Sequence, residues 1–174
     1  MIRVVVCVAF AMAVAGAPAA QSGPGTRTPG KTAITDVATD HLRIRYVNQL
    51  TASSDGSIAL TVEIAPRPRM HVYAPGAGDY QVVTMTLAEQ PGVRPRPLSY
   101  PPSEIYHFEP LNEHIPVYQK PFKLALHADI ESRAAPASAA RKSIKISGRL
   151  EYQACDDKVC FAPASVPLSW TVSP

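Results

Sequence analysis

Apolar and polar residues alternate along most of the chain after about residue 40. Alternation with a period of two places every second side chain on one face, which is typical of a β-strand with one buried face. A shorter apolar pair, Val72 and Tyr73, indicates a brief strand. The other predicted strands cover residues 42–47, 57–64, 81–87, 122–127, 144–150 and 165–172.

The segments between these strands carry residues that favour turns. Asp55-Gly56 is a hairpin turn signal. Residues 91–102 contain five prolines and predict an edge strand or an extended loop. Residues 106–116 have no clean period and predict a long loop, and residues 131–140 predict a surface turn. The 18 prolines of the chain oppose long helices. Short strands without a helical pattern predict an all-β fold, a β-sandwich.

The first residues have the pattern of a targeting segment. Arg3 precedes an uncharged apolar run over residues 4–17, and small residues follow. We therefore predict a signal peptide over residues 1–20, cleaved near Ala19 or Ala20. The run of 14 residues is shorter than the roughly 20 that span a bilayer. The prediction is export without stable membrane insertion, and an uncleaved membrane anchor is the alternative.

Composition limits the partners of the remaining chain. Residues 21–40 are rich in Gly, Pro, Thr and Ser and lack aromatic residues, so we predict a flexible lead-in before a domain over residues 41–174. Loss of the signal peptide leaves 16 basic and 14 acidic residues, a net charge of +2. This charge is too small to indicate a nucleic acid or an anionic membrane as partner.

The cysteines carry most of the chemical information. Cys7 lies in the predicted signal peptide, so the exported chain keeps one close pair, Cys155 and Cys160, with four residues between them. A tight turn there brings the Cα atoms within the disulfide range of about 4.4–6.8 Å. Closing so short a loop contributes on the order of 2 kcal/mol. The pair is therefore a redox couple or the structural disulfide of a non-catalytic binding module, and its small contribution favours the redox couple.

A metal-binding β-sandwich is a further alternative. Zinc needs four ligands, so two of His71, His107 and His114 would have to converge on the cysteines. Their spacing matches no compact zinc motif. Copper could use Cys, His and Met, but oxidation to a disulfide would compete with it. We therefore expect neither a metal nor a cofactor.

The cysteine segment resembles the amino-terminal periplasmic domain of the thiol:disulfide interchange protein DsbD. The likeness rests on the residues YQAC (152–155), VCFAP (159–163) and VPL (166–168). It extends more weakly to MHVYAP (70–75) and to residues 104–118, where the family has a cap loop. It covers most of the chain after about residue 40.

The resemblance implies a fold and a role. The fold would be an immunoglobulin-like antiparallel β-sandwich. The domain would take electrons from a DsbD-type membrane donor and pass them to oxidised periplasmic proteins, with thioredoxin-like proteins among its partners. It would thus be a thiol–disulfide oxidoreductase-type electron carrier. The full family protein continues into membrane and thioredoxin-like domains, so we expect a stand-alone version with those parts on other proteins, or a domain put to another use.

The resemblance also assigns the catalytic cysteines. Cys160 would attack a partner disulfide, and Cys155 would resolve the resulting mixed disulfide. Asp156 and Asp157 disfavour a thiolate at Cys155, while Lys158 acts in the opposite direction.

Further candidates lie in the segments that resemble the family. Leu111 would be the tip of the cap loop, where the best-known members carry Phe, and His71 stands where Tyr is familiar. From the residues alone, Tyr73 and Tyr106 are more often core or interface aromatics than catalytic residues, and an ordinary strand histidine is the alternative for His71. The candidates near the cysteines are His71, Tyr73, Tyr106, Leu111 and Phe161.

Overall fold

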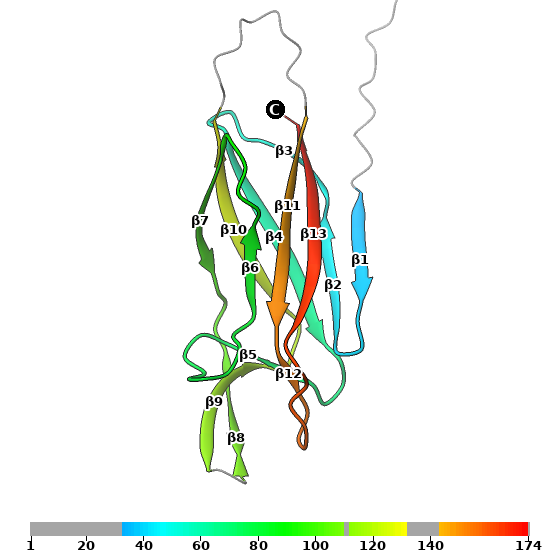
Figure 1. Cartoon of the computed structure of the whole chain (residues 1–174), viewed down its shortest axis with the longest axis vertical. Helices are drawn as coiled ribbons and strands as arrows, with labels where there is room; N and C mark the ends of the chain where they lie inside the picture. Colours follow the sequence, from blue (N-terminus) through cyan, green and yellow to red (C-terminus); the bar gives the residue numbers. More distant parts are fainter. Residues whose placement is uncertain (1–32, 110–111, 132–142, 174) are drawn as a thin grey trace, which may run out of the picture. The chain divides into compact units, whose positions relative to one another are not determined.

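Three sheets account for the architecture of the computed structural model, which describes residues 33–109, 112–131 and 143–173 and contains no α-helix among them (Figure 1). The sheets have the strand orders β1-β2-β4-β10-β7, β3-β13-β11-β6 and β12-β5-β9-β8. The strands are β1 (Ile34–Ala38), β2 (Leu42–Val47), β3 (Gln49–Thr51), β4 (Ser57–Pro66), β5 (His71–Tyr73), β6 (Thr84–Leu87), β7 (Val93–Ser99), β8 (Glu104–Phe108), β9 (Glu113–Tyr118), β10 (Phe122–Ile130), β11 (Ile144–Tyr152), β12 (Ala154–Cys155) and β13 (Ala164–Ser173).

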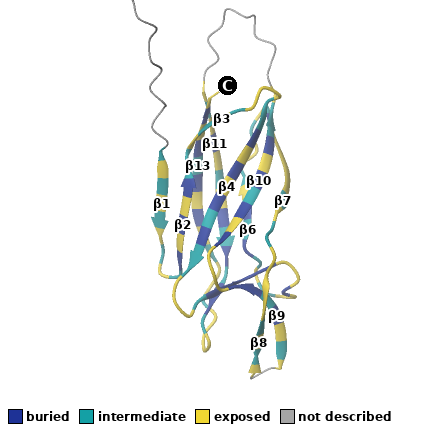
Figure 2. Ribbon diagram, turned by 180° about the vertical axis from the view of Figure 1, so that it is seen from behind, coloured by how far each residue is buried: buried dark blue, intermediate teal, exposed yellow. Residues whose placement is uncertain are grey.

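The sheets β1-β2-β4-β10-β7 and β3-β13-β11-β6, which have the longer strands and are here called the two larger sheets, pack as a sandwich around one apolar core. Along β4 and β10 buried residues alternate with exposed ones, which Figure 2 shows as alternating blue and yellow bands. The apolar faces of both sheets contribute to a single buried cluster, in which the Tyr46 and Trp170 ring centroids lie 5.3 Å apart. Strand pairing is antiparallel apart from β3 with β13. The predicted immunoglobulin-like antiparallel sandwich is confirmed.

The small third sheet holds the cysteine segment. β12 pairs with β5, so that Cys155 lies opposite His71, and β5 pairs in turn with β9. β8 and β9 form an antiparallel hairpin, here called the cap hairpin, which extends beyond β5 and β12 in Figure 1. The sequence therefore brings residues 71–73, 104–118 and 154–155 together in one sheet.

One prediction about the cap hairpin was wrong. Residues 106–116 were expected to form a long loop, but most of them belong to β8 and β9. β8 lies at the edge of its sheet and has no buried residue. Without a buried face there is no reason for apolar residues to alternate, and the period-two signal is lost. In contrast, residues 91–102 contain the edge strand β7, one of the two predicted alternatives.

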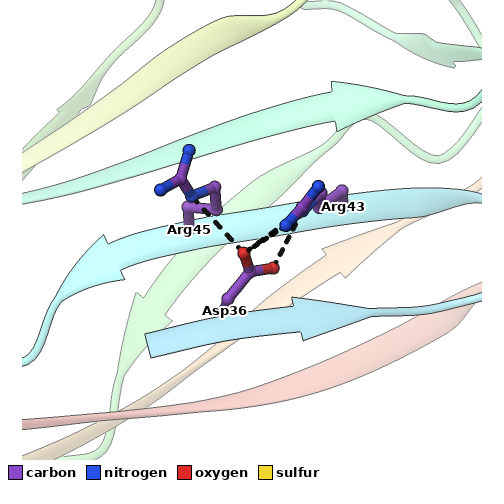
Figure 3. A network of polar contacts seen from close by, with 3 residues as sticks. All are labelled: Asp36, Arg43 and Arg45. Atoms are coloured by element: carbon purple, nitrogen blue, oxygen red, sulfur yellow. Dashed lines mark hydrogen bonds and ion pairs between the residues drawn. The ribbon is translucent and has the colours of Figure 1, made fainter. Parts of the chain in front are cut away.

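The chain enters the first sheet earlier than predicted. Strand β1 lies within residues 21–40, which were expected to form a flexible lead-in, and it pairs with β2. Asp36 of β1 accepts hydrogen bonds from Arg43 and lies 3.5 Å from the Arg45 guanidinium, as Figure 3 shows. The strand was missed because its residues are exposed or only half-buried. Residues 1–32, with the predicted signal peptide, and residues 132–142 lie outside the described residues.

Among the described residues, no helix has the length and apolar character that a bilayer crossing requires.

Candidate functional site

Cys155 and Cys160 form a disulfide across a tight turn. Their Cα atoms lie 4.1 Å apart, slightly below the predicted range. The backbone N–H of Asp156 donates to the carbonyl of Val159 (3.0 Å), and that of Phe161 donates to the carbonyl of Ala154 (2.9 Å). These two bonds flank the cysteines and hold them opposite each other.

The side chain of Asp156 closes the turn. Its Oδ1 accepts hydrogen bonds from the backbone N–H groups of Lys158 and Val159, both at 2.7 Å. These two bonds lower the pKa of the Asp156 carboxyl below its ordinary value. Asp156 is therefore a turn residue, held as a carboxylate beside the disulfide.

The two sulfurs have different surroundings. Cys155 is only 1% exposed and packs in a small cluster with Tyr73, Ile115 and Val117, whereas Cys160 is exposed. An incoming thiolate from another protein can therefore reach Cys160 and cannot reach Cys155 without displacing the cap hairpin. This asymmetry gives the disulfide an accessible end and a protected end.

The hydroxyl of Tyr73 lies against both sulfurs, 3.0 Å from Cys155 Sγ and 3.3 Å from Cys160 Sγ. Burial raises the pKa of Tyr73 to about 12, so the hydroxyl stays protonated near neutral pH and acts as a hydrogen-bond donor. Its ring stacks on Tyr80, with centroids 4.3 Å apart, and the Tyr80 hydroxyl donates to Glu113 Oε2. The Tyr73 ring is thus held in place through Tyr80, which is itself bonded to Glu113 of the cap hairpin.

Tyr106 of the cap hairpin contacts both His71 of β5 and the turn between the two cysteines. The ring of Tyr106 packs on the imidazole of His71, with centroids 4.6 Å apart, and its hydroxyl donates to Asp157 Oδ1 at 3.2 Å. Beside these groups lies a cavity of about 30 Å³ that is partly open to solvent. It is lined by His71, Tyr73, Tyr80, Tyr106, Phe108, Ile115, Cys155, Asp156 and Cys160.

Comparison with known proteins identifies the family. Residues 42–167 match the family described as "Thiol:disulfide interchange protein DsbD, N-terminal". The chain belongs to this DsbD family. The resemblance seen in the sequence is thereby confirmed, and family membership together with the Cys155–Cys160 disulfide supports thiol–disulfide exchange as the chemistry of this DsbD-type domain.

A solved structure shares the fold. The N-terminal periplasmic domain of ScsB from Proteus mirabilis aligns with a TM-score of 0.56 and 16% sequence identity. The alignment covers 79% of this chain and 51% of that one, so this chain spans about half the length of its structural relative. No curated protein matches the chain.

The DsbD-type site gathers some of the predicted residues and leaves others out. His71, Tyr73 and Tyr106 line the cavity beside the two cysteines. Phe161 does not line it; its ring packs instead against His41, with centroids 4.4 Å apart. Leu111, the predicted tip of the cap loop, lies outside the described residues.

Three lining residues were not predicted. Tyr80 lies in a turn after β5, where the sequence shows no pattern, and Phe108 and Ile115 belong to the hairpin that was expected to be a loop. The one sequence signal that could have placed these segments near the cysteines was the number of aromatic residues within them.

The histidines do not converge on the cysteines as the zinc alternative requires. His107 and His114 stack on each other on the cap hairpin, with centroids 4.5 Å apart, while His71 lines the cavity. Within the described part of the chain, no group of three or more His, Cys, Asp or Glu side chains is arranged to hold a metal ion.

Proposed function

We propose that this chain is a periplasmic thiol–disulfide exchange domain that carries electrons from a redox donor to oxidised proteins through Cys155 and Cys160. The observation that carries the proposal is the asymmetry of the disulfide in a DsbD-family domain, in which Cys160 is an exposed residue and Cys155 a buried one. Such an arrangement admits a partner at one sulfur and reserves the other for resolution.

The domain is loaded in two steps. A donor thiolate attacks Cys160 Sγ, the bond to Cys155 Sγ breaks, and its electron pair leaves on Cys155. The product is a mixed disulfide between the donor and Cys160. A second donor thiol then attacks the donor sulfur of this bond and releases Cys160 as a thiolate, so the pair gains two electrons.

Unloading reverses these roles. The Cys160 thiolate attacks the disulfide of an oxidised protein and forms a mixed disulfide with it. Cys155 then attacks Cys160 Sγ, the Cys155–Cys160 bond forms again, and the acceptor leaves with both of its sulfurs reduced. The Tyr73 hydroxyl, 3.0 Å from Cys155 Sγ in the oxidised domain, is placed to donate to the negative charge that appears on that sulfur.

Two features decide which thiol attacks. Burial of Cys155 disfavours a thiolate there, and the neighbouring carboxylates of Asp156 and Asp157 act in the same direction by like-charge repulsion. Cys160 is exposed, so its thiolate keeps its hydration. Cys160 is therefore the nucleophile toward other proteins, and Cys155 the resolving thiol.

The partners follow from this chemistry. We expect thioredoxin-like proteins to exchange with Cys160, and a DsbD-type membrane protein to act as donor. The predicted signal peptide over residues 1–20 would place the domain in the periplasm, which is also where the ScsB domain resides. The cap hairpin would cover Cys155 rather than Cys160, since Cys160 is exposed while the hairpin is in place.

The reduction potential tests the proposal. The protein is equilibrated with mixtures of reduced and oxidised glutathione, and the reduced fraction is read by thiol alkylation. We expect the pair to titrate at a potential above about −300 mV, the region of exchangeable disulfides. A potential far below that value would assign Cys155–Cys160 to a structural disulfide and contradict the exchange function.

A further inference from the structure

We propose that His71 is the proton acceptor and donor for Cys155 during disulfide exchange. It accepts the proton of the Cys155 thiol when that thiol closes the disulfide, and it returns the proton when Cys155 leaves. This inference rests on the proposed function and assigns a role within the same site.

The register of the third sheet places the two residues side by side. Cys155 of β12 lies directly opposite His71 of β5. Residues in such pairs point to the same face, with Cβ atoms about 4.5–5.5 Å apart. Both side chains line the cavity of about 30 Å³, which has room for a water molecule. The oxidised domain has no hydrogen bond between the imidazole and Cys155 Sγ, so the proton would pass through one water in this cavity.

Cys155 needs such a partner because it is buried. A thiolate at a site that is 1% exposed is costly, so the thiol must lose its proton as it attacks. When the disulfide opens, the same sulfur must regain a proton for the same reason. Because Cys155 is almost fully buried, a group that lines the cavity is better placed than bulk water to supply this proton.

The other lining groups are unsuited to this task. Tyr73 is hydrogen-bonded to the sulfur, but its pKa of about 12 makes the hydroxyl a donor that does not take up a proton near neutral pH. The pKa of Asp156 is lowered by its two backbone hydrogen bonds, so its carboxylate is a weak base. Among the described residues that line the cavity, His71 remains as the group able to gain and lose a proton near neutral pH.

The surroundings of His71 favour the neutral imidazole, which accepts the proton of Cys155, and the imidazolium that results is the form that can return it. Burial lowers its pKa, and the negative charges of Asp156 and Asp157 act against that effect. With its pKa below 6.5, the imidazole is neutral near pH 7 and can accept a proton. A negative charge that develops on Cys155 raises the pKa of the imidazole and favours transfer at that moment. The titratable and charged groups around it are Tyr73 and Arg69 on its own segment, Tyr80 in the following turn, Tyr106 of β8, Glu113 of β9, and Cys155, Asp156 and Asp157 of β12 and its turn.

The face of the His71 imidazole packs against a neighbouring aromatic ring. The Tyr106 ring lies on that face with a tilt of 33°, and the Tyr73 ring meets it nearly at a right angle, at 84°. Because the nitrogens of an imidazole lie in the ring plane, contact with the face does not occupy them. The stacked Tyr106 therefore fixes the ring without consuming its proton-transfer capacity.

In the resolving step the partner is released as Cys155 closes the disulfide. Cys155 Sγ forms a bond to Cys160 Sγ, and the bond from Cys160 Sγ to the partner sulfur breaks. The partner leaves as a thiolate with that electron pair. The proton of Cys155 passes to an imidazole nitrogen of His71 and then to water, so no further oxidant or reductant is needed.

A small disulfide separates the two halves of the reaction. Reduced protein is mixed with one equivalent of dithiobis(nitrobenzoate) in a stopped-flow instrument. The exposed Cys160 thiolate releases one nitrothiobenzoate in a first phase, and Cys155 releases the second when it closes the disulfide. For His71→Phe at pH 7 we expect the second phase to slow at least about 10-fold, since general bases contribute about 10²–10⁴-fold, while the first phase changes less than about twofold.

The pH profile distinguishes proton transfer from a structural effect. From about pH 5 to about pH 9, the wild-type second phase should level off above the pKa of His71, whereas that of His71→Phe should keep rising as Cys155 ionises unaided. His71→Gln retains a polar side chain that is not a base, and it should behave like His71→Phe. His127→Phe on the exposed side of β10 is the matched control and should leave both phases unchanged.

Two results would overturn the inference in different ways. A second phase with wild-type rate and profile in folded His71→Phe or His71→Gln means that His71 does not transfer the proton, and leaves the exchange function intact. Release of a single equivalent by the wild-type protein means that Cys155 does not resolve the mixed disulfide, which contradicts the proposed function as well.

Discussion

In the sandwich of the two larger sheets the buried side chains are apolar, whereas the small sheet β12-β5-β9-β8 buries groups that can react. The sandwich encloses residues such as Leu60, Leu124 and Trp170. The small sheet encloses Cys155 and Tyr73, together with His71, the one buried residue of the described chain that is polar apart from tyrosine and cysteine. The sandwich therefore supplies most of the stability, whereas the small sheet buries polar groups that position the disulfide.

The largest effect on stability should come from the sandwich. Trp170 is fully buried, so Trp170→Ala should lower the free energy of unfolding by about 3–5 kcal/mol through loss of contacts and creation of a cavity. Urea unfolding followed by circular dichroism measures this loss. Below the unfolding midpoint the variant should still exchange disulfides at the wild-type rate. A folded variant that has lost exchange would show that the two regions are not separate in role.

The double variant Cys155→Ser/Cys160→Ser should lose electron transfer and keep most of its stability. All electron transfer to a thioredoxin-like protein should cease, because both reacting sulfurs are gone. The free energy of unfolding should fall by only about 2 kcal/mol, since the disulfide closes a short loop. Retained partner binding together with a much larger loss of stability would favour the alternative, a binding module with a structural disulfide.

These expectations show what the sequence could reveal. In β4 and β13 one face is buried along the whole strand, so alternation of apolar residues predicted the sandwich directly. Strand β8 lies at a sheet edge and has no fully buried residue, only the half-buried Tyr106 and Phe108 on one face, so the cap hairpin left no such signal. β1 was missed for a related reason, because none of its residues is fully buried.

The site was predictable in its chemistry but not in its geometry. The spacing of Cys155 and Cys160 indicated a local pair, which the disulfide confirms, whereas the attacking role that the family resemblance gives to Cys160 stays a prediction. The burial of Cys155 depends on Ile115 and Val117 of the cap hairpin, residues about 40 positions away along the chain. Contacts over such separations leave no trace in local periodicity, so the difference in exposure of the two sulfurs appears only in the folded chain.

A smaller effect should follow from Tyr73→Phe, which removes the hydroxyl beside both sulfurs and keeps the ring. One hydrogen bond contributes about 0.5–1.5 kcal/mol, so attack by dithiothreitol on the disulfide should slow about 2- to 10-fold. Stopped-flow measurement of the oxidised protein gives this rate. Tyr118→Phe, whose hydroxyl donates to the carbonyl of Pro101, is the matched control. An unchanged rate in Tyr73→Phe would mean that its hydroxyl does not stabilise the leaving sulfur.

The smallest effect concerns pH. Because burial lowers the pKa of His71 below 6.5, the unfolded chain binds its proton more tightly than the folded chain does. Stability is therefore complete above pH 6.5 and declines as pH falls below it. His71→Gln should flatten the dependence of the urea midpoint on pH between about pH 7 and about pH 5. An equal slope in both proteins would show that His71 does not titrate differently in the folded chain.

The most direct test of the central claim is to trap the mixed disulfide. Cys155→Ser and Cys160→Ser are each reduced, mixed with an oxidised thioredoxin-like protein, quenched with acid and resolved on a non-reducing gel. The account predicts that Cys155→Ser accumulates a covalent complex through the exposed Cys160, and that Cys160→Ser, whose remaining sulfur is buried, accumulates almost none. Equal trapping by both variants, or trapping through Cys155 alone, would contradict the division of labour between the exposed and the buried sulfur.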